Sequence, residues 1–407
     1  LVPSFFVAAL SFAIGTLSGS MKAVYIAVTA LLVAWFLVVE VLGDQNLRWL
    51  AYVEPSGQAW LAERVAKGRG NAWLNANPIR PDAGLLINRA VLAALGVAAL
   101  AWTLRRWRGG LSSSEFGGEI RSGPLTRLLR WTLGRQEALE DRYSDWVGRG
   151  AVPRVETARP GPRAWLVQLF GSLRTELRLL GAERSLWIMV PMIMLLAGVD
   201  SVSHVGPFSV RVYPVSSEFA QQMVPILLIL LSGTTIFYTG EVFHRDDDAG
   251  VRGILYASPV SNSALLLGKL GAMVLLSATM VLLTVATAVV SQAVQWKLID
   301  GRSYLDLVPY AAIGSRVVLP AVLFLCVSSL VANVLVRGRY VGYFVCLIAG
   351  AGYVWLLVEG RRSLLVNPFA LGHWAYSDLT GLGPFAQRLA WHHLYWGAVL
   401  AAALALA

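Results

Sequence analysis

Long uninterrupted runs of apolar residues, separated by short polar turns, dominate the sequence. A helix needs roughly 20 apolar residues to cross the hydrocarbon core of a membrane. Nine stretches approach or exceed that length, at residues 2–18, 23–41, 84–103, 184–199, 219–239, 264–292, 306–334, 338–358 and 386–407. The pattern predicts an all-α, polytopic transmembrane helical protein.

Composition excludes a soluble globular protein. Of the 407 residues, 56% are hydrophobic and 14% are charged, and the mean hydropathy is +0.60. Soluble domains carry roughly 25% charged residues, so the excess apolar surface here needs lipid. The net charge is +10, but the basic residues flank the apolar runs, as the positive-inside rule requires. We therefore expect membrane lipid as a partner and no nucleic acid.

The basic residues also predict an orientation. Residues 104–163 contain twelve Arg against seven acidic residues, which places this segment in the cytoplasm. Parity of the spans then places residues 241–262 on the cytoplasmic side and residues 42–83 and 359–385 outside. The predicted location is the cytoplasmic (inner) membrane of a bacterium, with the chain passing through it many times.

An amphipathic helix is predicted at residues 164–182, directly before the fourth apolar run. Apolar residues recur there at helical spacing, among them Trp165 and Phe170, while polar residues such as Glu176 occupy the other face and Arg174 lies on the same helix. A helix of this kind lies in the membrane interface instead of spanning the bilayer.

The chain contains an internal repeat. Residues 1–41 align with 318–359, and the span after residue 84 aligns with 386–407. Landmarks recur in the same order, pairing Lys22 with Arg339, Glu40 with Glu359, Pro55 with Pro368 and Trp60 with Trp374.

The repeat predicts two pseudo-symmetric membrane halves of like topology. Residues 1–103 form the last three spans of the first half, 104–163 form an Arg-rich linker, and 164–407 form a second half with the interfacial helix and six spans. The first half is only partly present, and about 150 further residues are expected upstream of residue 1.

The polar loop between the fifth and sixth runs is the candidate functional segment. It begins at Glu241 and carries Asp246, Asp247 and Asp248, which would suit the N-terminus of a short helix at residues 249–257. Pro259 ends that helix. Two alternatives stay open for the loop: a solvated charged turn with no partner, and a metal site formed by His244 with the three aspartates.

This loop resembles the first cytoplasmic loop of permease subunits of ABC-2-type ATP-binding-cassette transporters, through its acidic start, its Ser258-Pro259-Val260-Ser261 stretch and its Gly268-Lys269. The resemblance implies that the loop forms a coupling helix that docks on a partner ATPase. The interfacial helix resembles the connecting helix of that family, and residues 42–83 and 359–385 resemble its extracellular re-entrant helices. The implied coupling residues are Glu241, Arg245, Asp246, Asp247, Asp248, Arg252, Tyr256 and Pro259.

A narrower resemblance is to bacterial fused double permeases, some of which continue into an M1-type aminopeptidase. The sequence contains no His-Glu-x-x-His, so a peptidase would lie beyond residue 407. The phosphate-binding motif Gly-x-x-x-x-Gly-Lys-Ser/Thr is also absent from the sequence. We therefore expect no enzyme activity, metal or cofactor on this chain, with ATP and Mg on the partner, expected to be an ATPase dimer. The family implies export or extraction of a lipophilic or peptide-like substrate.

Three ionisable residues in or beside the spans are candidates for a gate or substrate path: Glu40, Arg316 and Glu359. A structural role for them, in ion pairs between helices or as charges reaching the interface, is the alternative. Two other functions stay open: an ion-driven secondary transporter, and a non-transporting membrane scaffold for a catalytic domain beyond the ends of this chain.

Overall fold

The computed structural model describes residues 2–18, 21–42, 49–61, 76, 81–106, 161–203, 215–298, 305–336, 338–360 and 363–406. These residues are helical throughout, apart from turns and one isolated β-bridge between Ser377 and Gly381. The predicted all-α class is confirmed. The chain divides into two compact units, Leu1–Ala151 with Glu183–Val199, and Val152–Ala182 with Asp200–Ala407.

The first unit is built on α1 (Val2–Ser18) and α6 (Ala83–Arg106), which pack along each other, with α2 (Met21–Leu42) packed against α1. Gly96 of α6 permits this approach, because a Cβ there would lie 2.7 Å from the ring of Phe5. The unit also includes most of α10 (Arg184–Ser203), although the internal repeat predicts these residues to be part of the second half.

Residues 49–61, with α3 (Leu50–Val53) and α4 (Gln58–Trp60), are organised around the buried carboxylate of Glu54. Its Oε1 accepts hydrogen bonds from Trp35 Nε1 and the backbone N–H of Ser56, at 2.5 Å each. Asn88 of α6 donates to the Glu54 carbonyl at 2.9 Å. Burial alone would raise the pKa of Glu54, but hydrogen bonds from Ser56, Trp35 and Ala59 lower it below its ordinary value.

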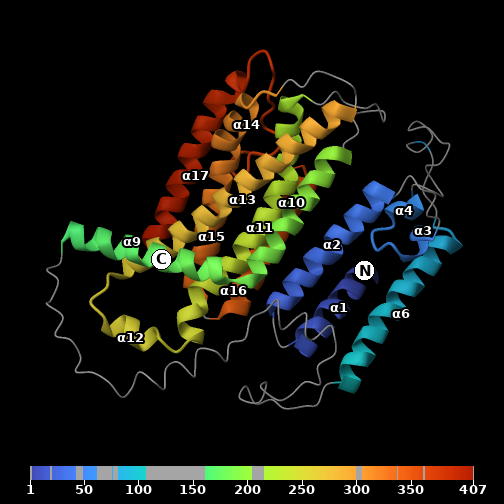
Figure 1. The fold of residues 1–407 in the computed structure, drawn as a ribbon, viewed down its shortest axis with the longest axis horizontal. Helices are drawn as coiled ribbons and strands as arrows, with labels where there is room; N and C mark the ends of the chain where they lie inside the picture. The colour runs from blue at the N-terminus through green and yellow to red at the C-terminus, as the bar shows by residue number, and fades with distance from the viewer. Residues whose placement is uncertain are drawn as a thin grey trace. The chain divides into compact units, whose positions relative to one another are not determined.

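The second unit has α11 (Ser216–Asp248), α13 (Asn262–Leu298) and α15 (Leu319–Leu335) at its centre (Figure 1). A helix α14 (Val308–Ile313) leads into α15 through a π-helical turn, η5 (Gly314–Val318). α16 (Arg339–Val358) packs on α11 and α15, and α17 (Ala386–Leu406), after the short turn η6 (Gly383–Phe385), packs on α15. The core side chains include Met223, Leu227, Tyr238, Met273 and Leu330.

Two elements of this unit lie at the end where α11 finishes. α9 (Pro162–Ala182) runs across the start of α13, and the short helix α12 (Arg252–Ala257) joins α11 to α13 (Figure 1). Gly268 allows α9 and α13 to touch, because a Cβ at that position would lie 3.2 Å from the backbone nitrogen of Leu173 and closer still to Ser172.

At the other end of the unit, residues 363–385 are organised around the buried Asn367. Its Oδ1 accepts a hydrogen bond from the Tyr353 hydroxyl at 2.8 Å, and its carbonyl lies 2.9 Å from His392 Nε2. The arrangement matches that at Glu54 of the first unit. In both units the residue before the aligned proline bonds an aromatic side chain of an earlier long helix (α2 or α16) and a polar side chain of a later long helix (α6 or α17).

Six helical segments among the described residues are long and apolar enough to cross a membrane: α6, α11, most of α13, α14 to α15, α16, and η6 to α17. Of the other three runs predicted as spans, α1 is a shorter apolar helix. For the run at 23–41, only the apolar stretch Ala23–Trp35 could be compared, and it leaves that prediction untested. α10 qualifies only together with α9, from which it is bent by 74°. Large apolar side chains on α16 face outward, including Phe344 at 63% exposure and Leu347 at 61%. Such a surface needs lipid, so the chain is a multi-pass membrane protein.

Candidate functional site

The loop between α11 and α13 consists of the short helix α12 with a turn on each side of it. α11 ends at Asp248, and Gly250 then adopts φ +67°, a left-handed conformation that glycine adopts without strain. α12 follows from Arg252 to Ala257 and ends in the turn before Pro259. The predicted helix at 249–257 therefore exists but starts three residues later.

The three aspartates are not at the start of that helix, so this prediction is wrong. Asp246, Asp247 and Asp248 form the last turn of α11, where the helix dipole disfavours negative charge. The structure offsets that cost with cations from other helices: Lys269 contacts Asp246 at 2.6 Å and Arg339 contacts Asp248 at 2.9 Å.

One group of charges joins three helices, and we call it the Glu176 cluster (Glu176, Arg245, Asp246 and Lys269). The Glu176 carboxylate of α9 lies 3.0 Å from Arg245 of α11 and 3.7 Å from Lys269 of α13. The side chains of Glu176 and Lys269 are only 8% and 9% exposed, and Lys269 also donates to the carbonyl of Val242 at 2.8 Å. Burial raises the pKa of Glu176, and the charges of Lys269 and Arg245 oppose that rise.

A second group, the Arg339 cluster (Glu241, Asp248, Arg339 and Tyr343), joins α11 to α16. The Arg339 guanidinium lies 2.9 Å from a carboxylate oxygen of each acidic residue. Tyr343 donates to the carbonyl of Phe237 at 3.2 Å and contacts Glu241 at 3.4 Å. Together the two clusters fix the end of α11 to α9, α13 and α16.

The loop is also fixed directly to α9. The side-chain amide of Gln168 donates to the carbonyl of Pro259 and accepts from the N–H of Ser261, at 3.1 Å each. Trp165 donates from Nε1 to the hydroxyl of Ser263 at 3.0 Å. α9 therefore holds the turn that follows α12.

The sequence pattern does not show which face of α9 packs on the rest of the unit and which face points outward. Polar side chains, including Gln168 and Glu176, point to the rest of the unit, where they make the contacts described above. Large apolar side chains point outward, with Val167 at 68% and Phe170 at 63% exposure. The helix predicted with Trp165, Phe170, Arg174 and Glu176 is therefore present, but part of its polar face, including Glu176, is buried against the rest of the unit.

Five predicted site residues are not part of the two clusters that the structure describes. The side chains of Arg252 and Tyr256 in α12, and of Glu40 in α2, lie outside the described residues. Arg316 is exposed in the π-helical turn η5. Glu359 is exposed at the end of α16, and neither residue joins the two clusters.

For the metal alternative, His244 Nδ1 lies 4.0 Å from Asp247 Oδ2. Among the ranges that the structure describes, no group of three or more His, Cys, Asp or Glu side chains is placed to hold a metal ion.

Three residues of the site, Gln168, Lys269 and Arg339, were not among the predicted site residues. The sequence did contain one sign that Lys269 has a partner. A charged lysine inside the apolar run at 264–292 is energetically unfavourable unless another group pairs with it.

Comparison of the chain with protein-family models, curated proteins and solved structures gives no match.

Proposed function

We propose that this chain is the permease of an ATP-binding-cassette transporter of the ABC-2 type, and that α12 with its adjoining turns is the surface on which a partner ATPase docks. The partner would bind ATP and Mg²⁺ and hydrolyse the nucleotide. The proposed cargo is a lipophilic or peptide-like substrate that is exported or extracted from the membrane.

The observation that carries this proposal is the contrast between α12 and its surroundings. Ile254 of α12 is 72% exposed and Gly253 is exposed as well, whereas the turns before and after α12 are fixed by ion pairs and hydrogen bonds. A short helix that projects from a rigid frame is suited to receive a force and to pass it on.

The contacts give that force two routes. Gln168 connects the turn after α12 to α9, and Lys269 connects Asp246 at the end of α11 to α13. A partner shifts a conformational equilibrium only if it binds one state better than the other. We propose that the ATP-bound and nucleotide-free ATPase contact α12 differently, and that α9, α11 and α13 respond together.

The test is co-purification of the full chain with an ATP-binding-cassette ATPase from its native membrane, followed by measurement of ATP hydrolysis in reconstituted vesicles. Ile254→Asp places a charge on the docking surface, and we expect it to abolish both co-purification and stimulated hydrolysis. Leu379→Asp is the matched control, because Leu379 is 96% exposed and lies in the segment that packs near the start of α11.

We expect the control to behave as the unmodified chain. Failure of the unmodified chain to associate with any ATPase in native membranes would overturn the proposal, and so would equal effects of the two substitutions.

A further inference from the structure

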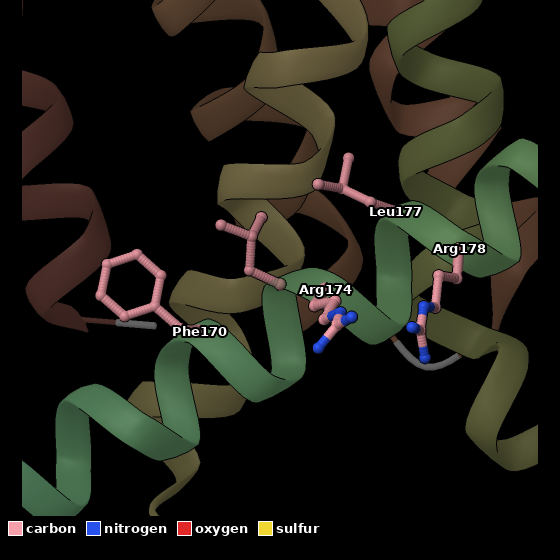
Figure 2. A pocket seen from close by; sticks show the side chains of 5 residues that line it. Phe170, Arg174, Leu177 and Arg178 are labelled. Carbon is pink, nitrogen blue, oxygen red and sulfur yellow. The ribbon is translucent and has the colours of Figure 1, made fainter.

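The outward face of α9 carries a shallow hollow that the proposed docking does not use. Five side chains line it, as Figure 2 shows. Its volume is about 550 Å³. They are Phe170, Leu173, Arg174, Leu177 and Arg178. The hollow therefore combines apolar carbon with two guanidinium groups.

The two arginines are placed unfavourably for an isolated helix. Arg174 and Arg178 stand four residues apart, a spacing at which like charges on a helix repel. Both are exposed, and in the described part of the chain neither has a carboxylate partner. An anion held between them would relieve the repulsion, and guanidinium groups bind phosphate oxygens in bidentate fashion.

The side chains divide by type around the helix. Figure 2 shows the guanidinium groups of Arg174 and Arg178 on one side of α9, while Phe170 and Leu177 point to the other. Leu166, which stands four residues before Phe170 on the same edge of the helix, is exposed too. Apolar groups on one edge and cations on the other match the boundary between acyl chains and headgroups.

We propose that this hollow binds an anionic phospholipid. Its phosphate lies between Arg174 and Arg178, and its acyl chains cover Phe170, Leu173 and Leu177. The inference rests on the membrane location of the chain and not on docking of an ATPase. A lipid bound there would also act on the rest of the second unit, because Glu176 on the inward side of the same helix pairs with Arg245 of α11 and Lys269 of α13.

The favoured lipid has a net negative charge. A zwitterionic lipid also carries a phosphate, but its ammonium group cancels the attraction of the two guanidinium groups. A cation near an anionic surface contributes about fivefold in binding. We therefore expect Arg174 and Arg178 together to enrich anionic lipid at α9 by about 10- to 30-fold over zwitterionic lipid, at low ionic strength.

A local reporter can measure this preference. Gly171 is exposed and a Cβ there meets nothing within 4 Å, so Gly171→Cys accepts a bimane label in a chain whose Cys326 and Cys346 are replaced by Ala. The labelled chain is reconstituted in phosphatidylcholine vesicles in which about one lipid in five is brominated, so that an anionic lipid is in the minority and its enrichment at α9 can be seen. The brominated lipid is phosphatidylglycerol in one set of vesicles and phosphatidylcholine in the other. Quenching of bimane reports which lipid stands next to α9.

We expect brominated phosphatidylglycerol to quench several-fold more strongly than brominated phosphatidylcholine, and Arg174→Gln with Arg178→Gln to remove the difference. The matched control replaces Arg105 and Arg106, which are exposed at the end of α6, by Gln and keeps the difference. Quenching by brominated phosphatidylcholine must be equal in all variants, which shows that α9 still lies on the bilayer.

Three results would overturn the proposal. The first is equal quenching by the two lipids in the unmodified chain. The second is an undiminished preference for the anionic lipid in the Arg174→Gln, Arg178→Gln variant. The third is that inorganic phosphate reduces the preference more than chloride does at the same ionic strength. The last result would mean that the site binds free phosphate.

Discussion

Neutralising Glu176 tests whether the Glu176 cluster holds α9 to the rest of the second unit. Removing one partner of a buried ion pair costs about 3–5 kcal/mol, because the remaining charge is left buried and unpaired. Here Arg245 is 20% exposed and can recover some hydration, and Lys269 keeps Asp246 at 2.6 Å. We therefore expect Glu176→Gln to lower the free energy of unfolding by about 2–3 kcal/mol.

A double-mutant cycle separates the ion pair from the loss of a buried carboxylate. Arg245→Gln alone leaves Glu176 with Lys269 at 3.7 Å, and we expect a loss of about 1–2 kcal/mol. The double variant should lose no more than Glu176→Gln alone, because no charge of this pair is then left unpaired. The resulting coupling energy between Glu176 and Arg245 is about 1 kcal/mol or more.

The assay is unfolding of the full chain in mixed micelles of dodecylmaltoside and increasing dodecyl sulfate, followed by circular dichroism. Arg178→Gln is the matched control on the same helix, since its side chain is exposed, and we expect a change within about 0.5 kcal/mol. A Glu176→Gln variant as stable as Arg178→Gln would refute the reasoning, and additive single losses would show that the pair contributes nothing of its own.

Three further predictions use other contacts. Gln168→Ala should leave ATPase co-purification intact but reduce stimulated ATP hydrolysis several-fold, because it removes the two hydrogen bonds that join the turn at Pro259 to α9; lost co-purification would contradict it. Gly268→Ala should destabilise the chain by about 1–3 kcal/mol in the micelle assay through its clash with α9, whereas Gly253→Ala, with no atom within 4 Å, should be neutral or slightly stabilising. Glu54→Gln should destabilise the chain at pH 7 but not at acid pH. The pKa of Glu54 in the folded chain lies below its ordinary value of 4.5. The carboxylate therefore stabilises the fold fully above pH 4.5, and this stabilisation is lost as the pH falls through the folded-state pKa. Equal losses at pH 7 and in that acid range would exclude this carboxylate as the cause.

The hydrophobic pattern was sufficient for the class of the protein and for the position of most helices. Runs such as 219–239 and 338–358 exceed what a soluble core can bury, so the prediction needed no knowledge of packing. Pro259 likewise marked the end of α12 correctly, because proline restricts its own backbone and that of its neighbour.

The helix-dipole rule predicted the wrong place for the three aspartates, because ion pairs with distant residues outweigh it. Asp246, Asp247 and Asp248 fit the start of a helix by the dipole rule, yet α11 continues through them to Asp248. Lys269 and Arg339 make that continuation tolerable, and they stand 23 and 91 residues away from their aspartate partners. No window along the sequence contains both members of such a pair.

The sequence by itself determined that the chain is helical, that it belongs in a membrane, and that a charged loop with a short helix follows the run at 219–239. Those properties depend on the water-to-lipid transfer of each segment, a sum over neighbouring residues. Only the tertiary structure decided which cations meet which carboxylates and which face of α9 turns outward. Buried charges must find partners, and here those partners come from helices that are distant in sequence.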